Sequence, residues 1–290
     1  MKIFNVKKEI IENKKVSADC YRIIFASKEI AEQAKPGQFL HIRCSDGYDP
    51  LLRRPISIHS IKNNVIAVLY RVVGKGTYLL SEKVSGEFLD VIGPLGNGFD
   101  YQLPVTSHQS PVLVGGGIGV APLYFLAQRL IKKCLNITVL VGADTKCNIL
   151  CIDEFKKLDC RVKISTDDGS AGTSGTVVDL LKKELILINS RLKTQSSKLK
   201  IFACGPVPML KHVAQLVCKY NVPCQVSLER QMACGIGACM GCTIKIRNPK
   251  SPEGQAYGAG EIRKDKLFDY KRVCKDGPVF DIKEIVWEEM

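Results

Sequence analysis

The stretch from Val112 to Leu123, VLVGGGIGVAPL, decides the fold of the middle of this chain. A short apolar run leads through four glycines into a helical pattern. Glycines at a strand-to-helix turn let the backbone approach a pyrophosphate, whose charge then faces the N-terminus of the helix. We therefore predict a nucleotide-binding turn, with an ordinary tight turn as the alternative because the spacing is not G-x-G-x-x-G. The glycines are Gly115, Gly116, Gly117 and Gly119.

The residues that follow this turn alternate between short apolar runs and longer amphipathic stretches. This rhythm is typical of a parallel sheet with helices on its faces. A second glycine turn, formed by Cys204, Gly205 and Pro206, follows the strand predicted at Ile201. Open α/β sheets bind ligands at the carboxyl ends of their strands, which strengthens the nucleotide prediction. The expected strands are 112–114, 137–141, 162–164, 201–203 and 226–228.

The residues before the turn show a different pattern of short strands separated by turn residues. Strands this closely spaced indicate a small antiparallel barrel. The chain has 290 residues, about twice the length of an average domain, which also favours several domains. We predict an antiparallel β-barrel over 1–104, an α/β parallel-sheet domain over 105–228 and a small C-terminal domain over 229–290. The expected barrel strands are 17–26, 38–43, 55–61, 65–73 and 87–92.

The C-terminal domain carries the most specific motif, with Cys234, Cys239 and Cys242 in the spacing C-x4-C-x2-C. Plant-type ferredoxins use this spacing to bind a [2Fe–2S] cluster. Glycines between the cysteines let the loop bend and point its N–H groups at the sulfur atoms. Cys274 is the only later cysteine and becomes the candidate fourth ligand, although a polar insert over 248–266 separates it from the others. A zinc knot or free buried thiols are the alternative.

Within the barrel, four consecutive residues combine a guanidinium, a rigid proline ring and a hydroxyl. The guanidinium suits a phosphate group of a ligand, and the hydroxyl could reach a nitrogen of a ligand ring. Two further short segments offer an aromatic ring, a second guanidinium and a flexible loop that starts a short helix. An iron–sulfur cluster passes single electrons whereas a nicotinamide passes a hydride, so a chain with both needs a flavin between them. We predict that flavin in the barrel. The candidate residues are Arg54, Pro55, Ile56, Ser57, Leu69, Tyr70, Arg71, Gly76 and Thr77.

The composition narrows the possible partners and compartment. Lys and Arg exceed Asp and Glu by 13, but they are scattered in pairs, which favours a solvated surface over nucleic-acid binding. The chain begins without the long apolar core of a signal peptide, and glycines and Pro122 interrupt its longest uncharged stretch. We expect a cytoplasmic protein with no membrane span. Thirteen cysteines without an export signal point to a reducing compartment, and the nine outside the cluster motif are assigned no metal.

Five stretches of the chain together resemble the ferredoxin–NADP reductase superfamily. They are Arg54–Ser57, Gly115–Pro122, Cys204–Pro206, the cysteine loop and the closing stretch Lys271–Phe280. More narrowly, they resemble the electron-transfer subunits of type B dihydroorotate dehydrogenases. The resemblance implies an FAD barrel, a nucleotide domain and a C-terminal [2Fe–2S] domain. It places a pyrophosphate contact on Arg54 and an isoalloxazine contact on Ser57. It also places the cluster ligands on Cys234, Cys239, Cys242 and Cys274.

The resemblance further implies a role inside a larger enzyme of pyrimidine (UMP) synthesis. Electrons would pass from dihydroorotate to FMN in a separate catalytic subunit, then through the cluster and FAD to NAD. We expect a heterotetramer of two copies of each subunit. No catalytic residue is predicted in this chain, which is not expected to oxidise dihydroorotate alone. The insert over 248–266 is longer than the family usually carries.

Two questions stay open from the sequence. Asp167 and Asp168 follow the strand at Val162, where a carboxylate would repel a 2′-phosphate, so we predict NAD rather than NADP. Two solvated turn residues are the alternative. For function, the alternatives are an NAD(P)H:ferredoxin or sulfide-linked reductase subunit with the same three domains, and a zinc-stapled binding module without redox cofactors.

Overall fold

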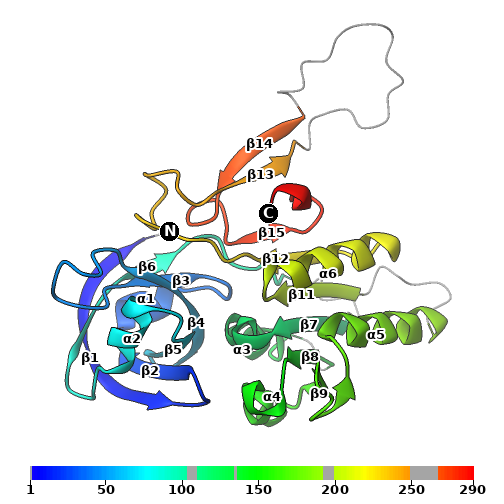
Figure 1. Cartoon of the computed structure of the whole chain (residues 1–290), viewed down its shortest axis with the longest axis horizontal. Coiled ribbons are helices and arrows are strands. Elements are labelled where there is room, and N and C mark those ends of the chain that lie inside the picture. Colours follow the sequence, from blue (N-terminus) through cyan, green and yellow to red (C-terminus); the bar gives the residue numbers. More distant parts are fainter. Residues whose placement is uncertain (1, 103–109, 134–135, 192–198, 249–266) are drawn as a thin grey trace, which may run out of the picture.

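The chain folds into a barrel, a helix-covered sheet and a C-terminal hairpin segment (Figure 1). The computed structural model describes residues 2–102, 110–133, 136–191, 199–248 and 267–290. Residues 249–266 of the predicted insert lie outside this range, as does Cys134. No helix within the described ranges is both long and apolar enough to cross a bilayer.

The barrel is closed by six antiparallel strands in the order β1-β2-β5-β4-β3-β6, as predicted. Strand β1 was not predicted, because its lysine-rich sequence is mostly half-exposed and buries only Ile10 completely. Helix α2 starts at the flexible loop, as expected. The elements are β1 (Phe4–Lys15), β2 (Cys20–Ala26), α1 (Lys28–Gln33), β3 (Phe39–Ile42), β4 (Arg54–Lys62), β5 (Val65–Arg71), α2 (Lys75–Ser81) and β6 (Phe88–Leu95).

The second part is a seven-stranded sheet in the order β10-β9-β8-β7-β11-β12-β15, parallel except for β15. Its strands are β7 (Ser110–Gly116), β8 (Thr138–Ala143), β9 (Arg161–Thr166), β10 (Thr173–Ser174), β11 (Leu199–Cys204), β12 (Cys224–Ser227) and β15 (Val279–Asp281). The helical elements are η1 (Gly117–Gly119), α3 (Val120–Leu130), η2 (Lys146–Asn148), α4 (Ile152–Lys157), α5 (Val177–Arg191) and α6 (Val207–Lys219).

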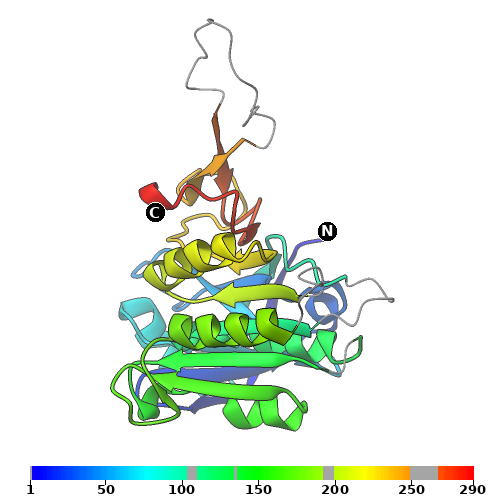
Figure 2. The same ribbon diagram turned by 90° about the vertical axis from the view of Figure 1, so that its right-hand side faces the viewer.

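Both faces of this sheet are buried, which explains its nearly continuous apolar strands. Alternating residues of β7 point to opposite faces. Val112 and Val114 pack with α5 and α6, whereas Leu113 packs with α3 and α4. Figure 2 shows α5 and α6 together in front of the sheet. The predicted parallel sheet with helices on both faces is therefore confirmed.

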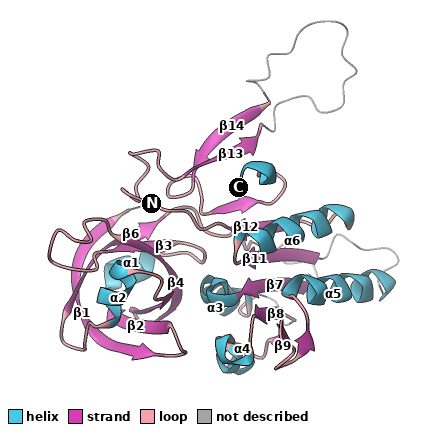
Figure 3. Ribbon diagram, in the orientation of Figure 1, coloured by secondary structure: helices cyan, strands magenta, loops and turns pink. Residues whose placement is uncertain are grey.

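The C-terminal segment is tied to the sheet and shares its core. Strands β13 (Thr243–Arg247) and β14 (Phe268–Arg272) form a hairpin (Figure 3), and η5 (Trp287–Glu289) ends the chain. Strand β15, which was not predicted, adds antiparallel to β12 at the edge of the sheet. Ile244, Val273 and Ile285 belong to the same buried cluster as the residues of α5 and α6. Packing on the sheet therefore supplies the core that this short segment cannot build alone.

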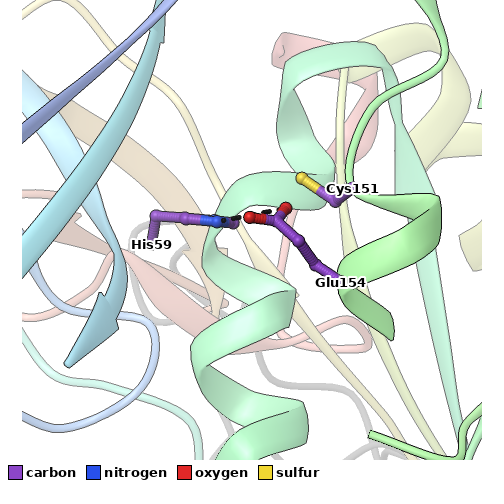
Figure 4. Close-up of side chains that lie close together, drawn as sticks. All are labelled: His59, Cys151 and Glu154. Atoms are coloured by element: carbon purple, nitrogen blue, oxygen red, sulfur yellow. Dashed lines mark ion pairs between the residues drawn. The ribbon is translucent and has the colours of Figure 1, made fainter. Parts of the chain in front are cut away.

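The barrel and the sheet meet at a buried histidine (Figure 4). The Nδ1 atom of His59, on β4, lies 3.0 Å from the carbonyl oxygen of Ala121 on α3, and its ring stacks on Tyr124 with the centroids 4.9 Å apart. Its Nε2 atom lies 3.5 Å from the Glu154 carboxylate of α4. Ligand atoms of His59, Cys151 and Glu154 all lie within 4.8 Å of one another, a spacing that could hold a metal ion. The guanidinium of Arg22, on β2 of the barrel, also lies 3.6 Å from the Glu154 carboxylate and balances its negative charge. We therefore interpret the group as an ion pair that holds the barrel against the sheet.

Replacing Glu154 with Gln tests this fastening. Burial raises the pKa of Glu154, but His59, Cys151 and Arg22 outweigh it, so folding lowers this pKa below its ordinary 4.5. The stabilisation is therefore present above pH 4.5 and is lost as the pH falls through the folded value. At pH 7 we expect Glu154→Gln to lower the free energy of unfolding by about 1 kcal/mol, which lowers the thermal unfolding midpoint by roughly 2–4 °C. The difference should shrink at lower pH.

The matched control is Glu32→Gln, which removes an exposed partner of Lys28 within α1 and should leave the midpoint unchanged. An unchanged midpoint in Glu154→Gln, or a difference that persists below its titration range, would contradict the fastening role.

Candidate cofactor sites

A cavity of about 660 Å³ opens where the three parts of the chain meet. Its size is within the range of ligand pockets for large organic molecules. The barrel supplies one wall, the glycine turns a second and the residues that follow β12 a third. The lining residues are Phe39, Leu52, Arg54, Pro55, Ile56, Ser57, Leu69, Tyr70, Arg71, Val73, Thr77, Ile118, Ala121, Pro122, Cys204, Ser227, Leu228, Glu229, Arg230, Gln231, Met232 and Pro278.

The cavity brings together eight of the nine barrel residues predicted from sequence. The ninth, Gly76, stands next to it at the start of α2, where the Arg54 guanidinium lies across the glycine. A side chain at Gly76 would have its Cβ atom 2.8 Å from Nε of Arg54. Arg54 pairs with no carboxylate among the described residues and donates only to the carbonyls of Leu52 and Arg53. A fixed guanidinium at the cavity edge suits a phosphate.

The remaining barrel residues form an aromatic and polar wall. Ser57 sits opposite Phe39 in the pairing of β3 with β4, and both side chains line the cavity. Tyr70 stacks on Tyr21 with 6.0 Å between ring centroids, and burial raises the pKa of its hydroxyl. Arg71 makes a 3.0 Å ion pair with Asp19 and reaches toward Gly117 at the start of η1. This wall offers a stacking surface and hydrogen-bonding groups for a flat polar ring.

The two glycine turns lie side by side because β7 and β11 are neighbours, with Gly115 opposite Cys204. A Cβ atom on Gly119 would collide with the Cys204 carbonyl, and one on Gly205 would come within 3.2 Å of the Gly116 nitrogen. Glycine is therefore required for this close approach. Of the residues predicted in these turns, only Cys204 lines the cavity; the others are Gly115, Gly116, Gly117, Gly119, Gly205 and Pro206, which lie beside it.

The third wall, Ser227 to Met232, was not predicted as part of a site. It follows β12 at the same carboxyl edge as the glycine turns, which is the signal that could have found it. Glu229 points into the cavity, where surrounding protein atoms replace bulk water and raise the pKa of its carboxyl. Burial likewise raises the pKa of the neighbouring Cys204 thiol, which stays protonated at neutral pH. Burial therefore favours the neutral form of both groups at this edge of the cavity.

The cysteine loop begins two residues after Met232, so a single residue, Ala233, separates the cavity wall from Cys234. Gly235 has φ +70° and Gly237 has φ +87°, a left-handed backbone that curls the loop round its own sulfur atoms. The Cys234 sulfur accepts the backbone N–H groups of Ala238 at 3.3 Å and Cys239 at 3.4 Å. These are the N–H donors predicted from the glycine content of the loop.

The four predicted cysteines come together. The Cys274 N–H donates to the Cys242 sulfur at 3.4 Å, and the Cys274 thiol interacts with both Cys242 and Cys234. Burial is the largest cause, and the neighbouring Cys242 and Cys234 thiols add to it, so that the pKa of Cys274 is raised to about 12. Burial opposes ionisation of Cys234, but backbone N–H groups led by that of Cys239 outweigh it and lower its pKa to about 6. Such crowding of thiols fits a site that a metal cluster completes.

Basic and imidazole side chains surround this loop. Arg272 donates to the Gly237 carbonyl at 2.9 Å and pairs with Asp276 at 3.1 Å, which places positive charge next to the Cys274 and Cys242 sulfurs. His41 of β3 lies under Gly235. Burial, followed by the charge of Arg53, lowers the pKa of His41 to about 4. The donor set and its surroundings fit a [2Fe–2S] cluster, and the cavity lining fits a flavin.

The loop predicts a pH-dependent difference in thiol reactivity when iron and sulfide are removed. Because the thiolate is the nucleophile, Cys234 should be alkylated at neutral pH, with the labelled fraction rising through about pH 6. Cys274 should stay unlabelled between pH 5 and 8, roughly, because its pKa is about 12. Pulses of iodoacetamide followed by peptide mass spectrometry measure both, with the exposed Cys147 as reference thiol. Faster labelling of Cys274 than of Cys234 would refute the assignment.

Two family models match this chain. The oxidoreductase NAD-binding domain matches residues 113–215. The iron-sulfur cluster binding domain of dihydroorotate dehydrogenase B matches residues 229–256 and 261–286. These matches cover the glycine turns and all four cysteines.

Relatives extend the similarity to the whole chain. The electron transfer subunit of dihydroorotate dehydrogenase B (NAD(+)) from Desulforamulus reducens is 40% identical over 289 residues, or 99% of each chain. The subunit of the same name from Fusobacterium nucleatum is 40% identical over 273 residues, or 93% of each chain.

Solved structures share the fold. A structure of NADH-dependent reduced ferredoxin-NADP oxidoreductase is 30% identical with a TM-score of 0.76, covering 97% of this chain and 90% of that chain. A ferredoxin NADP+ reductase from Neisseria gonorrhoeae with bound FAD and NADP is 17% identical with a TM-score of 0.62, covering 80% of this chain and 96% of that chain. Barrel, sheet, cysteine loop and full-length relatives agree, and the chain belongs to the family of electron transfer subunits of NAD-linked dihydroorotate dehydrogenase B.

Proposed function

We propose that this chain carries electrons from an FMN-containing, dihydroorotate-oxidising subunit through its [2Fe–2S] cluster and FAD to NAD. The observation that carries the proposal is the direct continuity between the two sites. Met232 lines the cavity and Cys234 begins the cluster loop, so only Ala233 stands between them, and the two residue steps span at most about 7 Å. Electrons pass efficiently only over short distances, and this chain supplies a short one.

The residues at the cavity divide the work of holding FAD. Arg54, lying across Gly76 at the start of α2, binds the pyrophosphate, and Thr77 completes that end of the site. Ser57 and its neighbours Pro55 and Ile56 contact the isoalloxazine ring. Leu69, Tyr70 and Arg71 line the same cavity and would contact the rest of the cofactor.

The glycine turns and the third wall hold the nicotinamide nucleotide. Gly115 to Gly117 and Gly119 let its pyrophosphate approach the sheet, while Cys204, Gly205 and Pro206 border the ring. Bound flavin supplies the ability to exchange a hydride on one side and single electrons on the other. The chain's own part is to orient the two rings, exclude water and keep the Cys204 thiol protonated beside them. Four thiolates, from Cys234, Cys239, Cys242 and Cys274, hold the cluster.

The partner is suggested by the full-length relatives, which are named electron transfer subunits of dihydroorotate dehydrogenase B. We infer a heterotetramer with two catalytic subunits, in the cytoplasm, that serves pyrimidine synthesis. The functional domains of this chain are then 1–104 for FAD, 105–228 for NAD and 229–290 for the cluster. Neither nucleic acid nor a membrane takes part.

The test is an anaerobic absorption titration of the chain co-expressed with its dihydroorotate-oxidising subunit. Dihydroorotate should bleach the flavin and iron–sulfur bands of the complex and leave the isolated chain unchanged. NADH should bleach both bands in the isolated chain. A chain that forms no complex, and whose flavin dihydroorotate never reduces, would refute the proposal.

The variant Cys274→Ser distinguishes the role of the cluster from that of the flavin in this test. It should retain flavin bleaching by NADH but lose flavin reduction by dihydroorotate by at least about tenfold, because one cluster ligand is gone. Cys218→Ser, at an exposed position, is the matched control and should behave as the wild type. The 30% identical ferredoxin-linked structure names the second candidate partner, so reduction of a soluble ferredoxin by the wild-type chain at a comparable rate would favour that function instead.

Asp168 is proposed to favour NAD over NADP. It follows β9 at the carboxyl edge of the sheet, and hydrogen bonds from Ser170 lower the pKa of its carboxyl and keep it charged. Asp168→Arg should raise the ratio of kcat/KM for NADPH to that for NADH by about tenfold, since a 2′-phosphate then meets attraction instead of repulsion. Asp153→Arg, an equal charge change at an exposed site of α4, should leave this ratio unchanged. An unchanged ratio in Asp168→Arg would remove Asp168 from the specificity site.

A further inference from the structure

His41 is a buried side chain that the barrel does not explain. It lies on β3, whose four residues are all buried, and it is only 1% exposed. Neither of its ring nitrogens makes a hydrogen bond of ordinary geometry within the described residues, although the backbone groups of Arg53 and Cys234 lie close enough to act on the ring. A buried imidazole without a well-formed hydrogen bond is costly, and such a group calls for an explanation at the site that it faces.

The ring faces the cluster loop. A Cβ atom built on Gly235 would lie 2.5 Å from Nδ1 and 2.9 Å from Cε1 of His41, so the glycine backbone rests directly on the ring edge. Gly235 follows the first predicted cluster ligand, Cys234, and adopts the left-handed conformation that turns the loop. The imidazole edge therefore lies beneath the point where the chain leaves Cys234.

The other side of His41 belongs to the flavin wall. Phe39 is two residues away on the same strand, and so on the same face, and it lines the cavity. Across the β3–β4 pairing, His41 lies opposite Pro55, which also lines the cavity. His41 thus stands between the proposed flavin site and the cluster loop.

We propose that His41 is a positioning residue for the cluster, which supports the turn at Gly235 and supplies an N–H to the loop at Cys234, the first predicted cluster ligand. An imidazole carries at least one N–H in either protonation state. Hydrogen bonds to the sulfur atoms of an iron–sulfur cluster raise its reduction potential, because they stabilise the more negative reduced form. This inference rests on the proposed cluster site, and it assigns part of the cluster's potential to the flavin barrel.

The test compares His41→Leu, which removes the N–H, with His41→Gln, which keeps one, in the full-length chain loaded with both cofactors. An anaerobic redox titration followed by electron paramagnetic resonance gives the cluster potential, and absorption gives the flavin potential. In His41→Leu we expect the ratio of reduced to oxidised cluster at a fixed potential to fall about tenfold, equivalent to about 59 mV for one electron. His41→Gln should recover most of this change. The flavin potential should move less than the cluster potential.

A second readout does not depend on the leucine variant folding. The chain has four histidines, so labelling with 15N-histidine places few labels near the reduced cluster. Electron spin echo modulation of the wild type should show a 15N coupling that disappears in His41→Gln. His59→Gln, at the other buried histidine of the barrel, should keep both the coupling and the potential.

Absence of the coupling, its persistence in His41→Gln, or an unchanged cluster potential in His41→Leu would overturn the role of His41. Equal shifts of the cluster and flavin potentials would also overturn it, because they would indicate a general structural change. Failure of the wild-type chain to assemble any cluster would instead refute the proposed function.

Discussion

The close contact between the barrel and the cysteine segment is the constraint on which the other features depend. It is made backbone to backbone: a Cβ atom on Gly96 would lie 2.6 Å from the Gly277 carbonyl oxygen. Asn97 adds side-chain hydrogen bonds to the carbonyls of Lys275 and Asp276, at 3.2 Å and 3.1 Å. Only a glycine allows such an approach. Because this contact leaves no room for intervening side chains, the cluster loop lies next to the cavity rather than at a distance.

The same constraint explains why the cavity is built from three parts. A barrel alone offers only one wall, and an open sheet binds nucleotides only at its carboxyl edge. The residues after β12 close the remaining side, and they do so because β12 carries the chain from that edge directly to Cys234. The contact between His59 and Glu154 holds the barrel wall and the sheet wall of the cavity together.

Sequence reasoning predicted the parts whose residues carry their own local signal. The cysteine spacing, the glycine turns and the alternation of strands and helices each depend on a few adjacent residues. Strand β1 has no such signal, since its burial is set by pairing with β2 and β6 on either side. Strand β15 is three residues long and exists only because β12 offers an edge. His41 acquires its role from Gly235, almost two hundred residues away in the chain, so spacing alone could not identify it.

The pairing of β12 with β15 has a further consequence for the cluster. Ser227 and Val279 are direct partners, so the chain leaves the sheet and returns to it at one point. Between them lie the third cavity wall, all four cysteines and the β13–β14 hairpin. The segment therefore begins and ends at neighbouring positions of the sheet, and residues such as Ile244 and Val273 pack it on the core of the sheet. A structure anchored in this way fixes the cluster relative to the nucleotide turns and the flavin wall together, which is what one-electron and two-electron steps on a single chain require.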